Sequence, residues 1–362
     1  MKPIRILHIL TALDRGGIET MLLNYHQNID TDIFQFDYLL HREGEFAYSE
    51  KVRSLGGRIY SLPEYNPFNM NYIKGLDSFF KDHKEYKIVH SHLNCLSSIP
   101  LKYAKKNGIP VRIAHAHIII NDQSIKSIYK KMVRHTIPIY ATDYCACSVE
   151  AGKWMFPSQK VVVIPNAIDL SRFFFDADKR KKFRNDLNIK NQFVFGTVGR
   201  FTKQKNHMFL IELMKQMPNE TLLFIVGEGP LKQNYIQAIN ENNLTNRVFV
   251  LDPTDDVPSF LCGIDSFLFP SIYEGLGIAA VEAQTAGLRT ICSEFVPKEV
   301  ACSSGIAFLP LDSKVWVEEM GNNVCTQERV IEERVNPDEN MYDIKTASIW
   351  LENYYKNLYL KA

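Results

Sequence analysis

The sequence lacks the features that mark several large classes of protein. Its 362 residues carry a formal net charge of +1, so bulk charge gives no reason to expect nucleic acid as a partner. No stretch approaches the roughly 18 consecutive apolar residues of a membrane-spanning helix. The apolar run at residues 4–10 is interrupted by His8 and followed by Asp14 and Arg15, which favours a buried strand over a signal peptide.

The seven cysteines follow no disulfide framework, which is typical of reduced thiols in a cytoplasmic protein. Cys145 and Cys147 form a C-x-C pair, but no second pair completes a zinc site. The Asp-x-Asp spacings at 30–32 and 176–178, which could hold a divalent cation, lie between predicted elements, where carboxylates are ordinarily solvated. We therefore expect no catalytic metal and no cofactor.

What the sequence does contain is an alternation of short apolar runs and longer amphipathic runs. Strand-like runs at residues 4–10 and 34–40 alternate with helix-like runs at 18–29 and 46–56, and the alternation continues to about residue 166. Such β-α-β alternation is typical of a parallel sheet with helices on both faces.

The alternation stops at residues 167–175 and restarts at 193–200 with a second series of strand-like runs. We therefore predict two α/β domains, 1–168 and 169–340, joined near this break. The aromatic-rich segment 341–362 is interpreted as a helix that packs back on the N-terminal domain.

Two motifs follow strand-like runs of the second domain, where parallel sheets bind their ligands. Arg200 and Lys205 come after the run at 193–200, and two cations at a strand end suit a diphosphate. The turn VGEGP at 226–230 would let a ligand approach the backbone. Each motif alone has an ordinary explanation, because this Arg–Lys spacing occurs by chance and Gly-Glu-Gly is a common turn.

A third motif, FPSIYEGLGIAAVEAQTAG, carries two glutamates eight positions apart, Glu274 and Glu282. Gly275 and Gly277 leave backbone N–H groups accessible at the start of a helix, which is an anion site, and Glu282 is predicted about two turns along that helix. A glutamate pair on a helix is usually solvated. The shared position of all three motifs at strand ends favours a ligand site instead.

With these motifs, the sequence resembles the retaining glycosyltransferases of family four, which have the GT-B fold of two facing Rossmann-like domains. GRFTKQK, GEGP, the E-x7-E pair, GGIETMLLNY, VVVIPNAID and DVPSFL carry the resemblance over nearly the whole chain. HSHLN, RIAHAH and EFVPKEV further resemble members that build bacterial capsular polysaccharides and exopolysaccharides. Asp252 departs from the family pattern, in which a glycine is common.

The resemblance implies a donor site for a nucleotide sugar in the second domain, with Gly199 and Gly227 among its residues. Arg200 and Lys205 would neutralise the diphosphate, Glu282 would accept hydrogen bonds from the ribose hydroxyls, and Glu274 would lie near the donor sugar. The backbone amides that would hold the phosphate or the sugar are those of Gly275, Leu276 and Gly277.

The first domain is expected to complete the site. Gly16 and Gly17 form a turn before a helix, and their amides would face the donor phosphate or the acceptor, although a plain strand–helix turn explains them as well. His115 and His117 end a strand and share one side-chain direction. The resemblance favours His115 as the catalytic histidine, with His117 as the alternative.

The implied function is a retaining, metal-independent transfer of a sugar, with UDP as the expected nucleotide, to a glycan or a polyprenyl-diphosphate-linked acceptor. Three rival classes can be weighed against this function. A metal-dependent GT-A glycosyltransferase is disfavoured because both Asp-x-Asp pairs lie between predicted elements. A dehydrogenase is disfavoured because no G-x-G-x-x-G follows a strand. A non-catalytic nucleotide-sugar or glycan-binding protein on the same fold is disfavoured by the intact Arg200, Lys205, Glu274 and Glu282.

Residues 123–142 contain no acidic residue, and their basic residues fall at helical spacing. A helix there would suit an anionic membrane surface, so we expect a cytoplasmic protein attached to the inner leaflet. A solvated charged face with its apolar side in the core is the alternative. The expected basic residues are Lys126, Lys130, Lys131 and Arg134, and the expected apolar side is Ile125, Ile128, Tyr129 and Met132.

Overall fold

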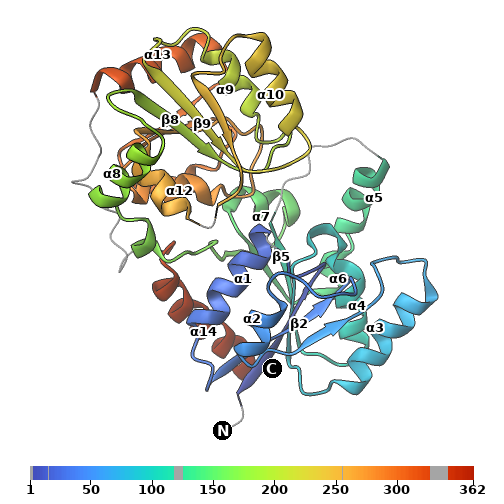
Figure 1. Cartoon of the computed structure of the whole chain (residues 1–362). Coiled ribbons are helices and arrows are strands. Elements are labelled where there is room, and N and C mark those ends of the chain that lie inside the picture. Colours follow the sequence, from blue (N-terminus) through green and yellow to red (C-terminus); the bar gives the residue numbers. More distant parts are fainter. Residues whose placement is uncertain (1–2, 15, 118–124, 255, 327–340) are drawn as a thin grey trace. The chain divides into compact units, whose positions relative to one another are not determined.

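The structure is a computed structural model, and it describes residues 3–14, 16–117, 125–254, 256–326 and 341–362, with side chains except at 125–127 and 326. The chain divides into two units, Met1–Asp169 with Asp338–Ala362, and Leu170–Pro337. Each unit has its own parallel sheet flanked by helices (Figure 1), which confirms the prediction of two Rossmann-like α/β domains.

In its described part, the first unit contains a seven-stranded parallel sheet in the order β3-β2-β1-β4-β5-β6-β7. Its strands are short and largely buried, as expected where helices cover a parallel sheet. The strands are β1 (Ile4–Leu10), β2 (Phe34–Leu40), β3 (Ile59–Ser61), β4 (Ile88–Ser91), β5 (Val111–Ala116), β6 (Asp143–Ala146) and β7 (Val161–Val163).

The helices of this unit follow the strands in the β-α-β manner. None of the described helices is long and apolar enough to cross a membrane. The helices are α1 (Gly17–Asn28), α2 (Ser49–Ser54), α3 (Met70–Asp82), the 3₁₀ turn η1 (Asn94–Ser97), α4 (Ser98–Lys106), α5 (Ile125–Arg134), α6 (Ile137–Tyr140), α7 (Val149–Met155) and the C-terminal α14 (Ile344–Leu360).

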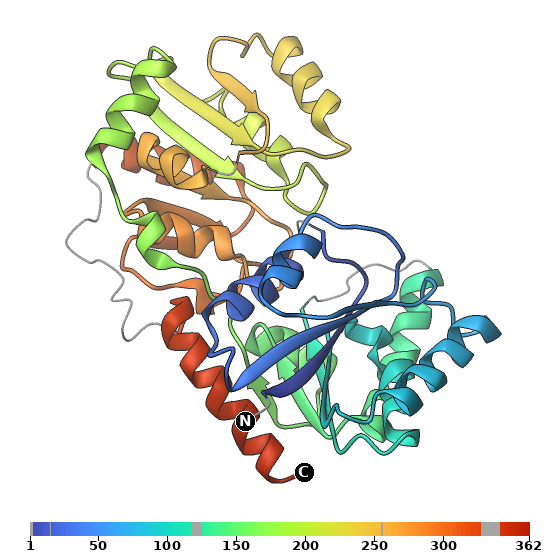
Figure 2. The ribbon, with the colours of Figure 1, turned by 60° about the horizontal axis from the view of Figure 1, so that its bottom comes forward.

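Helix α14 belongs to the first unit although it follows the second along the chain. It lies beside α1 in both views (Figure 1 and Figure 2), and Leu351 and Tyr355 join the core beneath the sheet. A backbone bridge between Ile168 and Asp343 pairs the two ends of this unit. The C-terminal segment therefore packs back on the N-terminal unit.

The described part of the second unit contains a six-stranded parallel sheet in the order β10-β9-β8-β11-β12-β13. Its strands are β8 (Phe193–Val198), β9 (Thr221–Val226), β10 (Val248–Leu251), β11 (Ser266–Phe269), β12 (Arg289–Ser293) and β13 (Ile306–Leu309). Its helical elements are η2 (Leu170–Phe173), α8 (Ala177–Asp186), α9 (His207–Leu213), α10 (Lys232–Glu241), α11 (Val257–Gly263), α12 (Ile278–Thr285), η3 (Lys298–Val300) and α13 (Ser313–Thr326).

Each sheet has one point where the strand order reverses, between β1 and β4 in the first unit and between β8 and β11 in the second. The loops after two such strands run in opposite directions, and this leaves a crevice at the carboxyl ends where open α/β sheets bind ligands. The predicted site residues of the second unit follow β8, β9 and β11, and those of the first unit follow β1 and end β5.

Candidate functional site

The loops after β8 and β11 bring Lys205 and Glu274 together at the reversal point of the second sheet. Lys205 Nζ donates a hydrogen bond to Glu274 Oε1 at 2.6 Å, and it lies 4.6 Å from the ring centroid of Phe269. The side chains are 19% and 9% exposed. Such a largely desolvated pair is costly to break on one side only, because the remaining charge would be left without a partner.

Arg200 differs from Lys205 in being exposed, and its side chain forms no hydrogen bond or ion pair with the described residues. The neighbouring turn is held by backbone contacts instead. Phe201 N donates to Glu228 O at 2.6 Å, and Gly199 N donates to Val226 O at 3.0 Å. The guanidinium is thus available for an anion while its backbone is fixed.

The Gly-Glu-Gly turn is glycine-rich because another loop of the protein approaches it. Gly227 has φ +151°, and a Cβ atom there would lie 2.1 Å from Gly199 O. Gly229 has φ +148° and packs in the same way on Phe201. Both glycines are thus required by close packing against the turn that carries Arg200, and the approach of a ligand to this backbone stays a prediction.

The segment after Glu274 leads into α12 through a left-handed residue. Gly277 is the N-cap with φ +102°, and no side chain caps the helix. The amides of Gly275 and Leu276 precede this cap, and Leu276 packs its side chain into the core. The uncapped start of the helix gives the segment the N–H groups of an anion site.

Glu282 lies on α12 a little more than one turn from the helix start, rather than about two turns as predicted. Its loss of solvation raises the pKa of the carboxyl to about 7, and the positive charges of Arg172 and Lys205 oppose this rise. A carboxyl group with a pKa near 7 beside cations is typical of a functional site.

In the first unit, Gly16 is the N-cap of α1 and Gly17 its first residue. The carboxylate of Glu19 folds back over Gly16, where a Cβ atom would lie 2.3 Å from Oε2. Burial raises the pKa of the Glu19 carboxyl, and the charge of Asp14 adds to the effect. The predicted anion site at these glycines therefore has a carboxylate of the protein lying over it.

His115 and His117 belong to a buried cluster of histidines on one face of the first sheet. His115 Nδ1 lies 3.0 Å from His90 Nε2, and His117 Nε2 lies 2.9 Å from His92 Nδ1. The cluster spans the carboxyl halves of three neighbouring strands, because parallel pairing sets His8 opposite His90. Its members are His8, His90, His92, His115 and His117.

The members of the cluster are hydrogen-bonded to one another, and burial keeps them neutral. Burial lowers the pKa of His90 and of His117 to about 3, and it holds the pKa of His115 well below the usual value. The ring planes of His115 and His117 are stacked, with centroids 4.0 Å apart.

Neutral imidazoles are also metal ligands, and two trios in the described chain have nitrogens within 4.8 Å of one another. The trios are His8 with His90 and His92, and His92 with His115 and His117. Both nitrogens of His92 are already hydrogen-bonded to other histidines, and the lone pairs of stacked rings run parallel rather than converge. The contacts thus describe a hydrogen-bonded ladder better than a coordination site.

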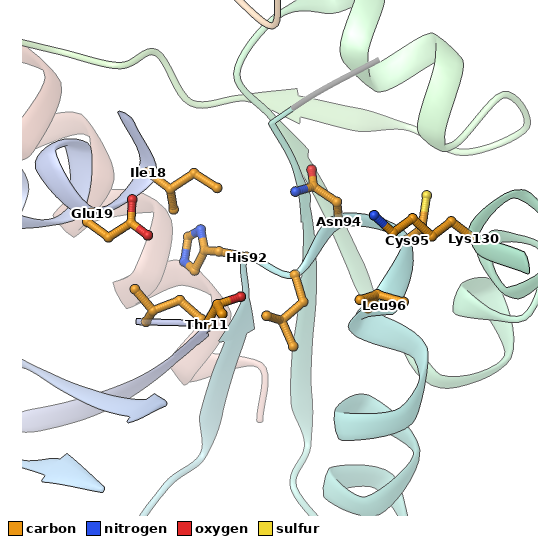
Figure 3. A pocket seen from close by; sticks show the side chains of 10 residues that line it. Thr11, Ile18, Glu19, His92, Asn94, Cys95, Leu96 and Lys130 are labelled. Carbon is orange, nitrogen blue, oxygen red and sulfur yellow. The ribbon is translucent and has the colours of Figure 1, made fainter. Parts of the chain in front are cut away.

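A cavity of about 190 Å³ opens at the reversal point of the first sheet (Figure 3). Glu19 of α1 and His92 line one side of it, and Asn94 and Lys130 of α5 line the other. Asn94 is left-handed with φ +54°, and its Oδ1 accepts a hydrogen bond from His117 N at 2.7 Å. Carboxylate, amide, imidazole and ammonium groups together suit a polyhydroxy ligand.

Helix α5 forms as predicted, and its attachment to a membrane stays a prediction. Arg134 donates to Trp154 O at 2.6 Å and lies over that indole ring, and Lys130 lines the cavity. The apolar Ile128 and Met132 are instead 53% and 67% exposed. The side chain of Lys126 lies outside the described residues, and Lys131 is partly buried.

The Asp-x-Asp and C-x-C pairs, which were considered above as metal sites, make other contacts in the structure. Asp176 caps α8 by accepting from the backbone of residues 178 and 179, and Asp30 accepts from Asp32 N. Cys145 is buried, with its Sγ 3.4 Å from Tyr354 Oη.

The clustering of His8, His90 and His92 with His115 and His117 was not predicted from the sequence. The signal was the H-x-H spacing, which occurs at both His90–His92 and His115–His117 and puts each pair on one face of its strand. The single His8 gave no signal, because only the strand order places it beside His90.

Two family profiles match the chain, one on each unit. Residues 15–172 match Glycosyltransferase Family 4, and residues 178–306 match Glycosyl transferases group 1.

Among related proteins, the chain is 30% identical over 336 residues to one from Bacillus subtilis strain 168 named as glycosyltransferase EpsF, covering 87% of this chain and 86% of that protein. It is 31% identical to the UDP-Gal:alpha-D-GlcNAc-diphosphoundecaprenol alpha-1,3-galactosyltransferase of Escherichia coli, covering 80% and 79%. Among solved structures, Anabaena HepE in complex with UDP superimposes with a TM-score of 0.84 at 16% identity, covering 98% of this chain and 100% of HepE.

Proposed function

We propose that this chain, which belongs to Glycosyltransferase Family 4 and has the GT-B fold, transfers a sugar from a UDP-sugar to a polyprenyl-diphosphate-linked or glycan acceptor. The observation that carries the proposal is the buried pair of Lys205 and Glu274, with the unpaired Arg200 nearby, at the reversal point of the second sheet. We place the reaction in the synthesis of a capsular polysaccharide or exopolysaccharide. This is supported by a relative from Staphylococcus aureus, 23% identical over 97% of this chain, that is named capsular polysaccharide biosynthesis glycosyltransferase CapH.

The donor site uses charge where charge develops. When the bond between the sugar and the diphosphate breaks, negative charge grows on the leaving phosphate, and fixed cations stabilise it. Lys205 and Arg200 supply these cations, and the uncapped start of α12 supplies N–H groups. Glu282 accepts hydrogen bonds from the ribose. UDP is supported as the nucleotide by the HepE complexes with UDP and with UDP-glucose.

The proposed reaction retains the anomeric configuration and needs no metal ion. The acceptor hydroxyl attacks the anomeric carbon from the side of the leaving diphosphate as the carbon–oxygen bond breaks, and its proton passes to the departing phosphate oxygen. A carboxylate nucleophile on the opposite face, which a retaining glycosidase needs, is then not required.

The acceptor is proposed to enter at the cavity between Glu19, His92 and Lys130. A lipid-linked acceptor is supported by the diphosphoundecaprenol substrate in the name of the Escherichia coli relative. Such an acceptor would bring the protein to the cytoplasmic leaflet, and α5 would meet it through the exposed Ile128 and Met132 rather than through a basic stripe.

The test incubates the full-length protein with a panel of UDP-sugars and an undecaprenyl-diphosphate-linked sugar, with and without EDTA. We expect one donor to give a product whose anomeric coupling in NMR matches that of the donor, at a rate that EDTA does not change. The Lys205→Ala variant is the inactive control. An inverted linkage or inhibition by EDTA would refute the mechanism, and tight binding without turnover would identify a binding protein instead.

A further inference from the structure

The histidine ladder of the first unit connects the predicted catalytic residue His115 to the C-terminal helix. His115 Nδ1 lies 3.0 Å from His90 Nε2, and His90 Nδ1 lies 2.8 Å from the hydroxyl of Tyr355 on α14. All three side chains are buried, and no other hydrogen bond of Tyr355 or His90 is present among the described residues. The chain of contacts therefore has two ends, the Tyr355 hydroxyl and His115 Nε2.

Tyr355, His90 and His115 each carry one exchangeable side-chain proton when neutral, and they share only two hydrogen bonds. One of the three protons is therefore left without an acceptor. In one arrangement Tyr355 donates to His90, His90 donates to His115 Nδ1, and His115 carries its proton on Nε2. In the other arrangement every bond is reversed, and the Tyr355 O–H is left without an acceptor. Each neutral imidazole has one donor nitrogen and one acceptor nitrogen, so choosing the direction of one bond fixes the others.

Two physical arguments select the first arrangement. A phenol is a better donor than an imidazole N–H, and an imidazole nitrogen is a better acceptor than a phenol oxygen, so Tyr355 donating to His90 makes the stronger bond. The first arrangement also leaves fewer buried groups without a partner. His115 Nε2 is buried and without a partner among the described residues in either arrangement, whereas the equally buried Tyr355 O–H is left unpaired only in the second.

We propose that Tyr355, acting through His90, fixes His115 in the tautomer that carries its proton on Nε2, so that His115 meets the substrate as a hydrogen-bond donor. Tyr355 and His90 are then positioning residues, and α14 helps to set the chemistry of a site built on β5. Burial keeps the pKa of all three groups in the range where they are neutral at pH 7. What His115 donates to, a hydroxyl or phosphate oxygen of the donor, rests on the proposed function, but its tautomer does not.

The test is nitrogen NMR of the histidine side chains in the ¹⁵N-labelled full-length protein without ligand. A protonated ring nitrogen resonates far upfield of a bare one, so the spectrum reports the tautomer directly, and the signals of His115 are those lost in a His115→Gln variant. We expect a protonated Nε2 and a bare Nδ1. A protonated Nδ1 of His115 in the wild-type protein would overturn the proposal even if no transfer were found.

Tyr355→Phe tests the cause, and Tyr354→Phe is its matched control, because the neighbouring Tyr354 hydroxyl contacts Cys145 instead of the ladder. We expect Tyr355→Phe to give His115 as a mixture of tautomers and to lower kcat roughly fivefold with little change in KM, as for the loss of one net hydrogen bond. Tyr354→Phe should leave the tautomer of His115 and kcat unchanged. If Tyr355→Phe leaves the His115 signals as they are in Tyr354→Phe, Tyr355 does not set the tautomer.

Discussion

The two units place different electrostatics at equivalent positions of their sheets. At the reversal point of the second sheet, charged groups gather, with Lys205 and Glu274 paired and Glu282 and Arg200 nearby. At the reversal point of the first sheet, five buried histidines of the described chain are hydrogen-bonded to one another as neutral rings. Ion-paired charge is thus concentrated at the reversal point of the second sheet, and buried neutral hydrogen-bonding groups are concentrated at that of the first.

The difference suggests a division of labour. A diphosphate needs cations that are held in place before it arrives, and a buried ion pair supplies a fixed cation. A sugar needs hydrogen bonds of defined direction without a charge that would attract anions elsewhere, and neutral imidazoles supply these. The following predictions separate the two halves.

Acidification should give the largest difference between the two units, in their folding stability. The histidines of the ladder stay neutral in the folded protein because burial lowers each pKa, whereas the unfolded chain takes up protons below about pH 6.5. Folding stability is therefore present above that pH and is lost as the pH falls, by about 2 kcal/mol at pH 5 for each histidine that stays neutral.

Hydrogen exchange at pH 7.5 and pH 5, corrected for the intrinsic rate, measures this loss. Amides of β1, β4 and β5 should become much less protected relative to those of β8 and β9. Equal changes in both sheets would show that the histidines do not dominate the acid response.

Replacing Lys205 by Ala should have the largest effect on catalysis. It removes the cation and also leaves Glu274 buried without a partner. We expect a loss of 2–4 kcal/mol of transition-state stabilisation, or about 30- to 1,000-fold in kcat/KM. Lys203→Ala, which removes an exposed lysine from the same loop, is the matched control and should stay near wild type. Equal rates for the two variants would remove the diphosphate assignment.

Replacing His115 by Asn should raise the activation free energy by about 2 kcal/mol and so lower kcat roughly 30-fold, because one hydrogen bond to charge developing in the transition state is lost. His117→Asn should cost less, since His117 Nε2 is occupied by His92 and its backbone is held by Asn94. Steady-state kinetics of the two variants decides between the histidines, and a larger loss for His117→Asn would reverse the assignment.

The exposed apolar side of α5 should contribute a smaller, separable effect on membrane attachment. Changing Ile128 and Met132 together to Asp should weaken co-sedimentation with anionic liposomes roughly tenfold, since each side chain buries only part of its surface at an interface. Ile349→Asp, which charges an equally exposed position on α14, is the control. Unchanged binding of the double variant would exclude α5 as the docking surface.

Titration of Glu282 should give the smallest effect, a dependence of KM for the UDP-sugar on pH. Its folded pKa of about 7 lies above the usual value, so its contribution to stability is present at low pH and is lost as the pH rises through 7, opposite in sign to the histidines. Only the carboxylate accepts from both ribose hydroxyls, so KM for the UDP-sugar should fall roughly fivefold from pH 6 to pH 8. Glu282→Gln should abolish that dependence, and a retained dependence would assign it to another group.

Much of the fold was predictable because it follows local patterns. The strands at Ile4–Leu10 and Phe34–Leu40 lie where the apolar runs predicted them, and the helix predicted at 18–29 forms at Gly17–Asn28. The three charged motifs of the second unit were also found, because each stands directly after a strand. Whether Arg200, Lys205 and Glu282 act as proposed remains for the experiments above.

What the sequence did not predict depends on contacts between distant segments. The histidine ladder needs β1 to pair with β4, and the link to Tyr355 spans 265 residues from His90. The surroundings of α5 could not be predicted, because periodicity shows two faces of a helix but not which one is covered. Trp154 of α7, which attracts Arg134, decides that here.

The most direct test of the division between the units is isothermal titration calorimetry of UDP with wild-type protein, Lys205→Ala and His115→Asn. The account predicts that Lys205→Ala weakens UDP binding at least tenfold, whereas His115→Asn binds UDP like the wild type although both variants lose transfer activity. If His115→Asn weakened UDP binding as much as Lys205→Ala, or if Lys205→Ala bound UDP normally, the assignment of charge recognition to the second unit would be contradicted.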